Sequence, residues 1–166
     1  MLQILTSGDW SEWLPIYVWV IEHPEGVIVV DTGETSRAAG PDYFPAWHPY
    51  FRYAVRFDVA PDDEIGPQLR ARGIDPERDV RQVVLTHLHT DHMGGLYHFP
   101  NSDWLLDETD HRAATGWTGR LLGYPSQHLP DWFRPQYLRW DDGPLGPFPR
   151  SQALTKDGRV VAVPTP

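Results

Sequence analysis

The run Gln82-Val83-Val84-Leu85-Thr86 leads directly into His87-Leu88-His89-Thr90-Asp91-His92, and Gly94-Gly95 follows one residue later. Its first part has the apolar residues Val83-Val84-Leu85 at its centre, and we interpret it as a buried strand. Four side chains that can bind a metal therefore stand just past the carboxyl end of a predicted buried strand. Open α/β sheets place their ligand sites at such ends. The run therefore predicts an α/β fold with a metal site at the end of strand 82–86.

The four candidate ligands are His87, His89, Asp91 and His92, and both imidazole nitrogen and carboxylate oxygen suit zinc. Residues two apart in an extended segment point the same way, so His87 and His89 can share one metal. Asp91 and His92 lie past the bend and can face a second metal. Two metals would acidify water and hold the attacking and leaving oxygens of a hydrolysis. The alternative, an exposed polar turn, explains three histidines and an aspartate less well. We expect Gly94-Gly95 to permit a tight turn and to start a helix beside the metals.

The composition narrows the class of protein. The chain of 166 residues suits one domain, and its net charge of -9 makes a nucleic-acid partner unfavourable. With no cysteine, histidines and carboxylates remain as the available metal ligands. Met1–Thr6 shows no secretory signal, and no apolar stretch reaches the roughly 18 residues of a membrane helix. We therefore predict a cytoplasmic protein without a membrane partner.

The remaining elements follow from local patterns. Residues 16–21 and 27–30 predict a hairpin of two strands around the turn 23–26, because β-branched residues flank turn-forming ones. Segments 34–60 and 116–150 read as a long aromatic connection and an irregular region. Further predicted elements are a helix over 63–72 capped by Asp62 or Asp63 with Pro67 inside it, a strand over 103–106, a helix over 108–114 capped by Asp107, and a strand over 159–163 after the turn 156–158.

The pattern His-x-His-x-Asp-His-x-Gly-Gly at residues 87–95 resembles the signature of the metallo-β-lactamase superfamily, and Asp31-Thr32-Gly33 after an apolar strand fits that resemblance. It implies the N-terminal part of an (αβ/βα) sandwich, with a mixed sheet and flanking helices. It also implies two zinc ions per complete site, the first bound by His87 and His89 and the second by Asp91 and His92. Asp91 would further orient the attacking hydroxide or protonate the leaving group as a catalytic residue. Asp31 would support the metal centre, or else would only cap a turn.

Within the superfamily the chain is most similar to N-acyl-homoserine lactone lactonases. The opening Leu14-Pro15-Ile16-Tyr17, the 56 positions from Asp31 to His87 (87 − 31), and the helix after the motif carry this likeness. The resemblance implies that the metal-bound hydroxide opens a lactone ester ring. Other hydrolases of the fold (a thioesterase, a phosphotriesterase or a β-lactamase) and a non-catalytic remnant stay open as alternatives.

The aromatic connection offers a substrate groove. An acyl chain needs apolar walls, and the candidates are Trp47, Tyr50, Phe51 and Phe57. The alternative is that these side chains only pack the long connection. The exposed aromatics of residues 43–57 could instead serve a homodimer interface.

Family members continue into a Pro-Gly-His-x-x-Gly-His segment, which supplies further metal ligands, whereas this chain stops at Pro164-Thr165-Pro166. We therefore expect residues 1–166 to form an incomplete hydrolase domain whose second half is missing and one sheet face of which lacks its cover. Each metal would keep two protein ligands, fewer than the three of most catalytic zinc sites, so we expect weak zinc binding and little activity. The histidines outside the motif are expected to be surface or packing residues: His23, His48, His98, His111 and His128.

Overall fold

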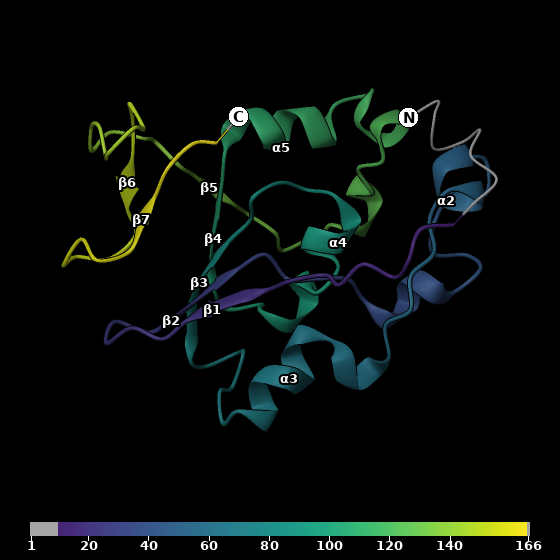
Figure 1. The fold of residues 1–166 in the computed structure, drawn as a ribbon, viewed down its shortest axis with the longest axis horizontal. Coiled ribbons are helices and arrows are strands. Elements are labelled where there is room, and N and C mark those ends of the chain that lie inside the picture. The colour runs from purple at the N-terminus through teal and green to yellow at the C-terminus, as the bar shows by residue number, and fades with distance from the viewer. Residues whose placement is uncertain (1–9, 166) are drawn as a thin grey trace.

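A mixed five-stranded sheet lies at the centre of the computed structural model, which describes residues 10–165 (Figure 1). Its spatial order is β1-β2-β3-β4-β5; β1 and β2 pair antiparallel as the predicted hairpin, and the other neighbours pair parallel. A separate antiparallel hairpin joins β6 to β7. The strands are β1 (Trp19–Ile21), β2 (Val27–Val30), β3 (Val80–Val84), β4 (Asp103–Leu106), β5 (Gln136–Tyr137), β6 (Gln152–Ala153) and β7 (Val161–Ala162). The α/β class and the mixed sheet are thereby confirmed. Met1–Thr6, the basis for predicting no secretory signal, lies outside the described residues.

The helices are short, and α4 lies between α3 and α5 in Figure 1. The α-helices are α2 (Pro49–Tyr53), α3 (Ile65–Ala71), α4 (Thr90–Met93) and α5 (Glu108–Thr115). Single turns of 3-10 helix occupy Ser36–Ala39, Pro61–Asp63, Leu96–His98, Gly119–Leu122 and Ser126–His128. No helix in the described part of the chain is long and apolar enough to cross a membrane.

Alternating residues of the central strands build two apolar clusters, one on each face of the sheet. Val29 and Val83 point to the face where α3, α4 and α5 contribute to the larger cluster. Ile28 and Val84 point to the other face, where side chains of the β6–β7 region pack against them. Because both faces of β2 are covered, its sequence is apolar throughout rather than alternating. β3 has this character only at its end, in Val83 and Val84.

The second face is covered only in part. Leu154 and Val160 lie between β6 and β7 and pack on the central strands of the large sheet. At this place the expected absence of a cover is wrong. Towards the sheet edge formed by β1, Tyr17 and Trp19 each keep 67% of their surface exposed and stack on one another. On this face, aromatic surface therefore stays exposed at the β1 edge.

Three strands differ from their predicted bounds. β7 covers only Val161–Ala162 and not the predicted residues 159–163. β1 begins at Trp19 rather than at residue 16. β3 ends at Val84. The amide of Leu85 still donates to the carbonyl of Leu105 in β4 (2.9 Å), but the amide of Thr86 bonds to the Asp31 carboxylate and not to a strand. The run 80–84 is therefore the buried strand, and Leu85 and Thr86 begin the loop that carries the histidines.

Two helices show how capping decides their ends. Asp107 caps α5 as predicted, and its carboxylate accepts a hydrogen bond from the amide of Thr109 (2.7 Å). The predicted cap of α3 is wrong, since Glu64 is the N-cap and the helix begins at Ile65. Pro67 then lies in the first turn, where a missing N–H removes no helical hydrogen bond.

Candidate metal centre

The carboxyl ends of β2 and β3 bring Asp31 and Thr86 together. The two strands are parallel neighbours, and the amide of Asp31 bonds to the carbonyl of Val84 (2.8 Å). Asp31 has φ +60°, a left-handed conformation that Asp tolerates better than most residues. This turn points its buried carboxylate at the loop after β3. The sequence therefore places the histidine loop at the edge of the sheet where open α/β sheets hold their ligands.

His92 lies between two carboxylates. Its Nδ1 is 2.8 Å from Oδ2 of Asp31, and its Nε2 is 3.5 Å from Oδ2 of Asp91. Because the Asp31 carboxylate is an acceptor, Nδ1 of His92 carries a proton, and Nε2 is the ring nitrogen directed at Asp91. Asp31 also accepts hydrogen bonds from the amide and the hydroxyl of Thr86 (2.8 and 3.0 Å). It therefore caps the turn and orients a histidine at the same time.

The three imidazoles of the motif gather at one place. The ring of His87 lies 4.0 Å from that of His92 and 4.7 Å from that of His89, between centroids. Burial lowers the pKa of His87, and the neighbouring histidines add to this effect. Burial also acts to lower the pKa of His92, but the hydrogen bond and charge of Asp31 outweigh it and raise the pKa. A neutral His87 is in the form that binds metal ions.

The donor set fits metal ions in pairs. Two ligands of a tetrahedral zinc at about 2.0 Å are roughly 3.3 Å apart, close to the 3.5 Å between His92 Nε2 and Asp91 Oδ2. The perpendicular rings of His87 and His89 form the other pair. Within residues 10–165, no three of these four ligands have donor atoms that all lie within 4.8 Å of one another. The geometry therefore suits two ions with two ligands each better than one ion.

Gly95 packs against the backbone beneath the loop. The amide and hydroxyl of Thr32 both donate to the carbonyl of His92 (2.8 and 2.9 Å), and the amide of Gly95 donates to the Thr32 hydroxyl (3.2 Å). A Cβ on Gly95 would stand 2.4 Å from the Thr32 carbonyl oxygen. The α-helix beside the predicted ligands, α4, ends at Met93 before the glycines, and the helix that starts after them is a single 3-10 turn, Leu96–His98, with Gly95 as its N-cap. The glycine is needed there for close contact between two backbones.

Glu34 and Tyr124, which no sequence pattern singled out, contact the loop. Glu34 accepts a hydrogen bond from the hydroxyl of Thr90 (2.6 Å). Tyr124 stacks on His89. These contacts join segments distant in sequence, and no local pattern signals them. Thr86 was predicted only as the last residue of a strand, whereas its amide and hydroxyl bond to Asp31.

The four predicted groove residues separate into different environments. Phe51 and Phe57 pack around Phe44, at centroid distances of 4.0 and 5.6 Å, as the packing alternative proposed. Trp47 is 57% exposed. Tyr50 is half-buried, and burial together with the charge of Asp91 raises its pKa. Tyr50 therefore lies close enough to Asp91, a predicted metal ligand, for the charge of that carboxylate to affect its hydroxyl.

A groove of about 980 Å³ reaches Asp91 from another direction. Its walls are the segment 10–18, the segment 54–59 and helix α3, and Phe57 is the one predicted groove residue among the described residues that line it. Trp13, Leu14 and Ile16 supply apolar surface on the N-terminal wall. No sequence pattern predicted this wall: residues 16–18 were expected to be part of a strand, and residues 10–15 carried no signal for a groove.

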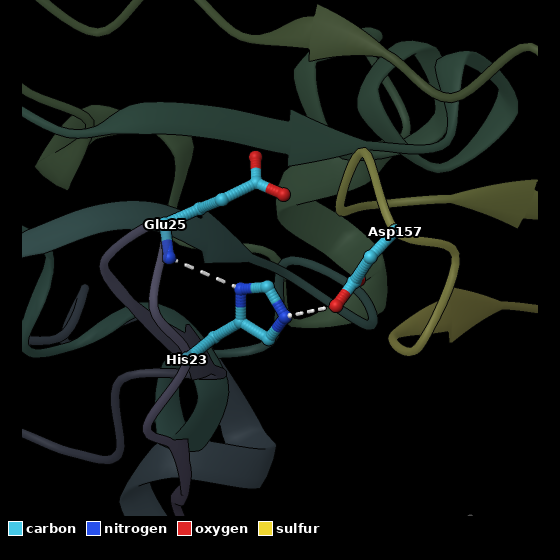
Figure 2. A group of neighbouring side chains, drawn as sticks. All are labelled: His23, Glu25 and Asp157. Atoms are coloured by element: carbon cyan, nitrogen blue, oxygen red, sulfur yellow. Dashed lines mark hydrogen bonds and ion pairs between the residues drawn. The ribbon is translucent and has the colours of Figure 1, made fainter.

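A second group of possible ligands contains His23, Glu25 and Asp157, whose donor atoms all lie within 4.8 Å of one another. Figure 2 shows the His23 ring between the amide of Glu25, which donates to Nδ1 (3.2 Å), and Asp157, which accepts from Nε2 (3.1 Å). A metal on Nε2 would require the proton on Nδ1, where the Glu25 amide already donates. The carboxylate of Glu25 also accepts from Arg81 (3.1 Å) and from the amide of Lys156 (2.8 Å). This group is therefore a tether between the β1–β2 turn and the β6–β7 turn.

The other histidines outside the motif have packing partners. His98 bonds to Glu64 and His111 to Tyr137, while His128 stacks on Tyr43; His48 is buried among aromatic rings. The expectation that they are surface or packing residues agrees with these contacts.

Comparison with protein families gives one match along most of the chain. The family model described as the metallo-beta-lactamase superfamily matches residues 11–158. Among curated proteins, N-acyl homoserine lactonase AttM of Azorhizobium caulinodans is 31% identical over 131 residues, which cover 78% of this chain and 43% of AttM. N-acyl homoserine lactonase AiiA of Bacillus thuringiensis subsp. kurstaki is 30% identical over 105 residues, covering 61% of this chain and 40% of AiiA. The chain thus spans less than half the length of these relatives.

Solved structures show the same fold. One is an N-acyl homoserine lactone hydrolase with the product N-hexanoyl-L-homoserine bound at its catalytic metal centre. It has a TM-score of 0.58 and 23% sequence identity, and the alignment covers 75% of this chain and 47% of that structure. A quorum-quenching N-acyl homoserine lactone lactonase gives the same TM-score and identity, with 75% and 44% covered.

Proposed function

Because this chain belongs to the metallo-beta-lactamase superfamily, we propose that residues 87–92 form the zinc-binding core of a hydrolase that opens the ring of N-acyl homoserine lactones or similar lactones. The position of His92 is the observation that carries the proposal. Asp31 fixes its Nδ1 at 2.8 Å, so that Nε2 faces Asp91 at 3.5 Å and is the nitrogen that can bind a metal. A carboxylate that orients a histidine in this way is the usual partner of a metal-binding imidazole.

The two ions have separate ligand pairs in this proposal. His87 and His89 bind the first zinc, and Asp91 and His92 bind the second, so a complete site holds two. The ring arrangement and the short separation of His92 and Asp91 support this division. Two protein ligands are fewer than most catalytic zinc ions have, so we expect these residues by themselves to bind zinc weakly.

The chain's own residues prepare the chemistry. When bound, the zinc ions supply Lewis-acid chemistry, which acidifies water and stabilises negative charge on the ester oxygens. Asp31 holds His92 in the tautomer that leaves Nε2 unprotonated. Asp91 lies at the end of the groove with part of its carboxylate exposed, where it can accept a proton from water and return one to the leaving oxygen.

The groove and the relatives together suggest the substrate. Apolar side chains such as Leu14 and Ile16 line a space that ends at Asp91, which suits an acyl chain attached to a polar ring. The relatives with 30–31% identity are named as N-acyl homoserine lactonases, from which we infer a small lactone substrate and a role in quorum quenching. The cytoplasmic location and the homodimer remain predictions.

The decisive test compares metal binding with hydrolysis. Co²⁺ titration of the chain should give the absorption of a histidine-bound ion, and His92→Ala should remove it, whereas His111→Ala, a variant of a histidine outside the motif, should leave it. Hydrolysis is measured on the protein from the complete reading frame that contains this sequence, with N-hexanoyl homoserine lactone, a thioester, a phosphotriester and a β-lactam. We expect the lactone to be preferred and Asp91→Ala to slow its opening by about 100-fold or more. Equal Co²⁺ binding by the His92→Ala and His111→Ala proteins would refute the metal centre, and preference for another ester would refute the substrate.

A further inference from the structure

A buried carboxylate lies directly beneath the histidine loop. Glu34 follows the Asp31–Gly33 turn and keeps only 3% of its surface exposed. A carboxylate so far from water needs hydrogen-bond donors, since an unpaired buried charge is very unfavourable. The position of those donors therefore shows which part of the molecule the carboxylate holds in place.

Both oxygens of Glu34 have a partner. One accepts a hydrogen bond from the hydroxyl of Thr90 (2.6 Å), and the other accepts from the amide of Thr35 (2.9 Å). Thr90 is itself buried, and it stands in the sequence between His89 and Asp91. It is thus the residue that separates one predicted ligand pair from the other.

The same carboxylate contacts the far end of α4. A Cβ on Gly94 would stand 2.4 Å from Oε1 of Glu34 and 2.7 Å from the amide of Thr35. The backbone of α4 is therefore pressed against Glu34 at its end as well as bonded to it at its beginning. A shift of Glu34 would move both ends of the helix that carries Asp91 and His92.

We propose that Glu34 is a positioning residue that fixes Thr90, and thereby sets the separation of the two ligand pairs in the metal centre. The inference rests on the proposed function, because it assigns to Glu34 a role in binding the same ions. Glu34 touches no predicted ligand side chain and acts through Thr90 and the α4 backbone.

A second buried carboxylate provides a matched control. Glu64 accepts hydrogen bonds from the amide of Ser36 (2.7 Å), from His98 (2.8 Å), and from the hydroxyls of Thr35 and Tyr97. It is as buried as Glu34, and it also bonds to the segment after β2, at Thr35 and Ser36. None of these partners of Glu64 lies within residues 87–92. Replacing Glu64 should therefore disturb folding without selectively loosening the metal loop.

The test uses two independent measurements on the chain and five variants: Glu34→Gln, Thr90→Val, the double variant that combines these two changes, Thr90→Ser and Glu64→Gln. Amide hydrogen exchange without metal reports how firmly residues 89–95 are held. Co²⁺ titration reports the dissociation constant of the metal centre, for which removal of an outer partner of metal ligands typically weakens binding by about 10- to 100-fold.

We expect Glu34→Gln and Thr90→Val each to speed exchange in residues 89–95 and to weaken Co²⁺ binding by about 10- to 100-fold. The double variant should be no weaker than the weaker single variant, because both changes break one contact. Thr90→Ser, which keeps the hydroxyl, should restore both properties, and Glu64→Gln should change neither selectively.

Unchanged exchange in residues 89–95 of both Glu34→Gln and Thr90→Val would overturn the positioning role, whatever the metal binding. If Glu34→Gln does not fold, the Thr90→Val and Thr90→Ser pair still decides the question. Absence of Co²⁺ binding by the unmodified chain would instead contradict the proposed metal centre, while the exchange measurement would still report on Glu34.

Discussion

The ring of Tyr124 lies flat against the ring of His89, with centroids 4.4 Å apart and an angle of 11° between the planes. Tyr124 also packs against the main apolar cluster. It therefore connects a predicted metal ligand to the core, and it comes from a region that has almost no regular structure.

Replacing Tyr124 should loosen His89. Stacked aromatic pairs contribute about 0.5–1.5 kcal/mol, so we expect Tyr124→Ala to weaken Co²⁺ binding by roughly 2- to 12-fold. Tyr124→Phe keeps the ring and should bind Co²⁺ like the unmodified chain. Titration of the three proteins checks this, and equal affinities for all three would show that the stacking does not orient His89.

Asp31→Asn should change the tautomer of His92. Asparagine tolerates the left-handed backbone of residue 31, so the turn should survive. Its amide can donate to Nδ1, which would place the proton of His92 on Nε2 and block that atom as a ligand. We expect metal affinity to fall by about 10- to 100-fold, with ¹⁵N spectra of the imidazole showing the new tautomer. A variant whose spectra keep the proton on Nδ1 would contradict this account.

Two buried carboxylates should give the metal-free chain opposite responses to pH. Burial, with the charges of Asp91 and Glu64, raises the pKa of Glu34 from 4.5 to about 7 despite its hydrogen bonds. The folded state then holds this proton more tightly than the unfolded state, so the free energy of unfolding falls as pH rises from about 4.5 to 7.

Glu64 behaves in the opposite sense. Burial acts to raise the pKa of Glu64, but hydrogen bonds from Ser36, Tyr97 and His98 lower it from 4.5 to about 2. Its stabilisation is present above pH 4.5 and is lost as pH falls towards 2. Urea unfolding across this range should show Glu34→Gln flattening the curve above pH 4.5 and Glu64→Gln flattening it below. Curves parallel to that of the unmodified chain would exclude these assignments.

The tether in Figure 2 should affect structure and leave metal binding alone. His23→Ala removes the bond to Asp157, so we expect faster amide exchange in β6 and β7. Co²⁺ affinity should stay unchanged, because the Glu25 amide donates to Nδ1 of His23, so that the ring proton is on Nε2 and blocks it as a ligand. A loss of bound metal in this variant would show instead that His23, Glu25 and Asp157 bind an ion.

The sequence predicted those features that depend on neighbours in the chain. The apolar runs located β2 and β4, and Asp107 marked the start of α5. β5 escaped prediction because Gln136 and Tyr137 are exposed and form a strand only by pairing with β4. The short helix α2 was not predicted, because it lies in the long aromatic connection. Its first residue, Pro49, is a common start signal for a helix.

In the candidate site, too, the features set by neighbouring residues were predicted and those set by distant residues were not. Its four ligands lie within one short run, so their types and spacing were readable. The residues that hold them come from elsewhere: Glu34 is 56 positions from Thr90, and Tyr124 belongs to a region without periodicity. The contact of Glu34 with Thr90 follows from the pairing of β2 with β3, and the contact of Tyr124 with His89 follows from the packing of a distant segment, neither of which the sequence alone specifies.

The bond between Asp31 and His92 joins residues 61 positions apart, and it also has a kinetic meaning. It can form only after β2 and β3 have paired across their long crossover, and such non-local pairings form slowly. A metal ion that needs this bond would therefore bind the finished sheet and not its precursors. It should slow unfolding in proportion to its concentration while leaving the folding rate unchanged.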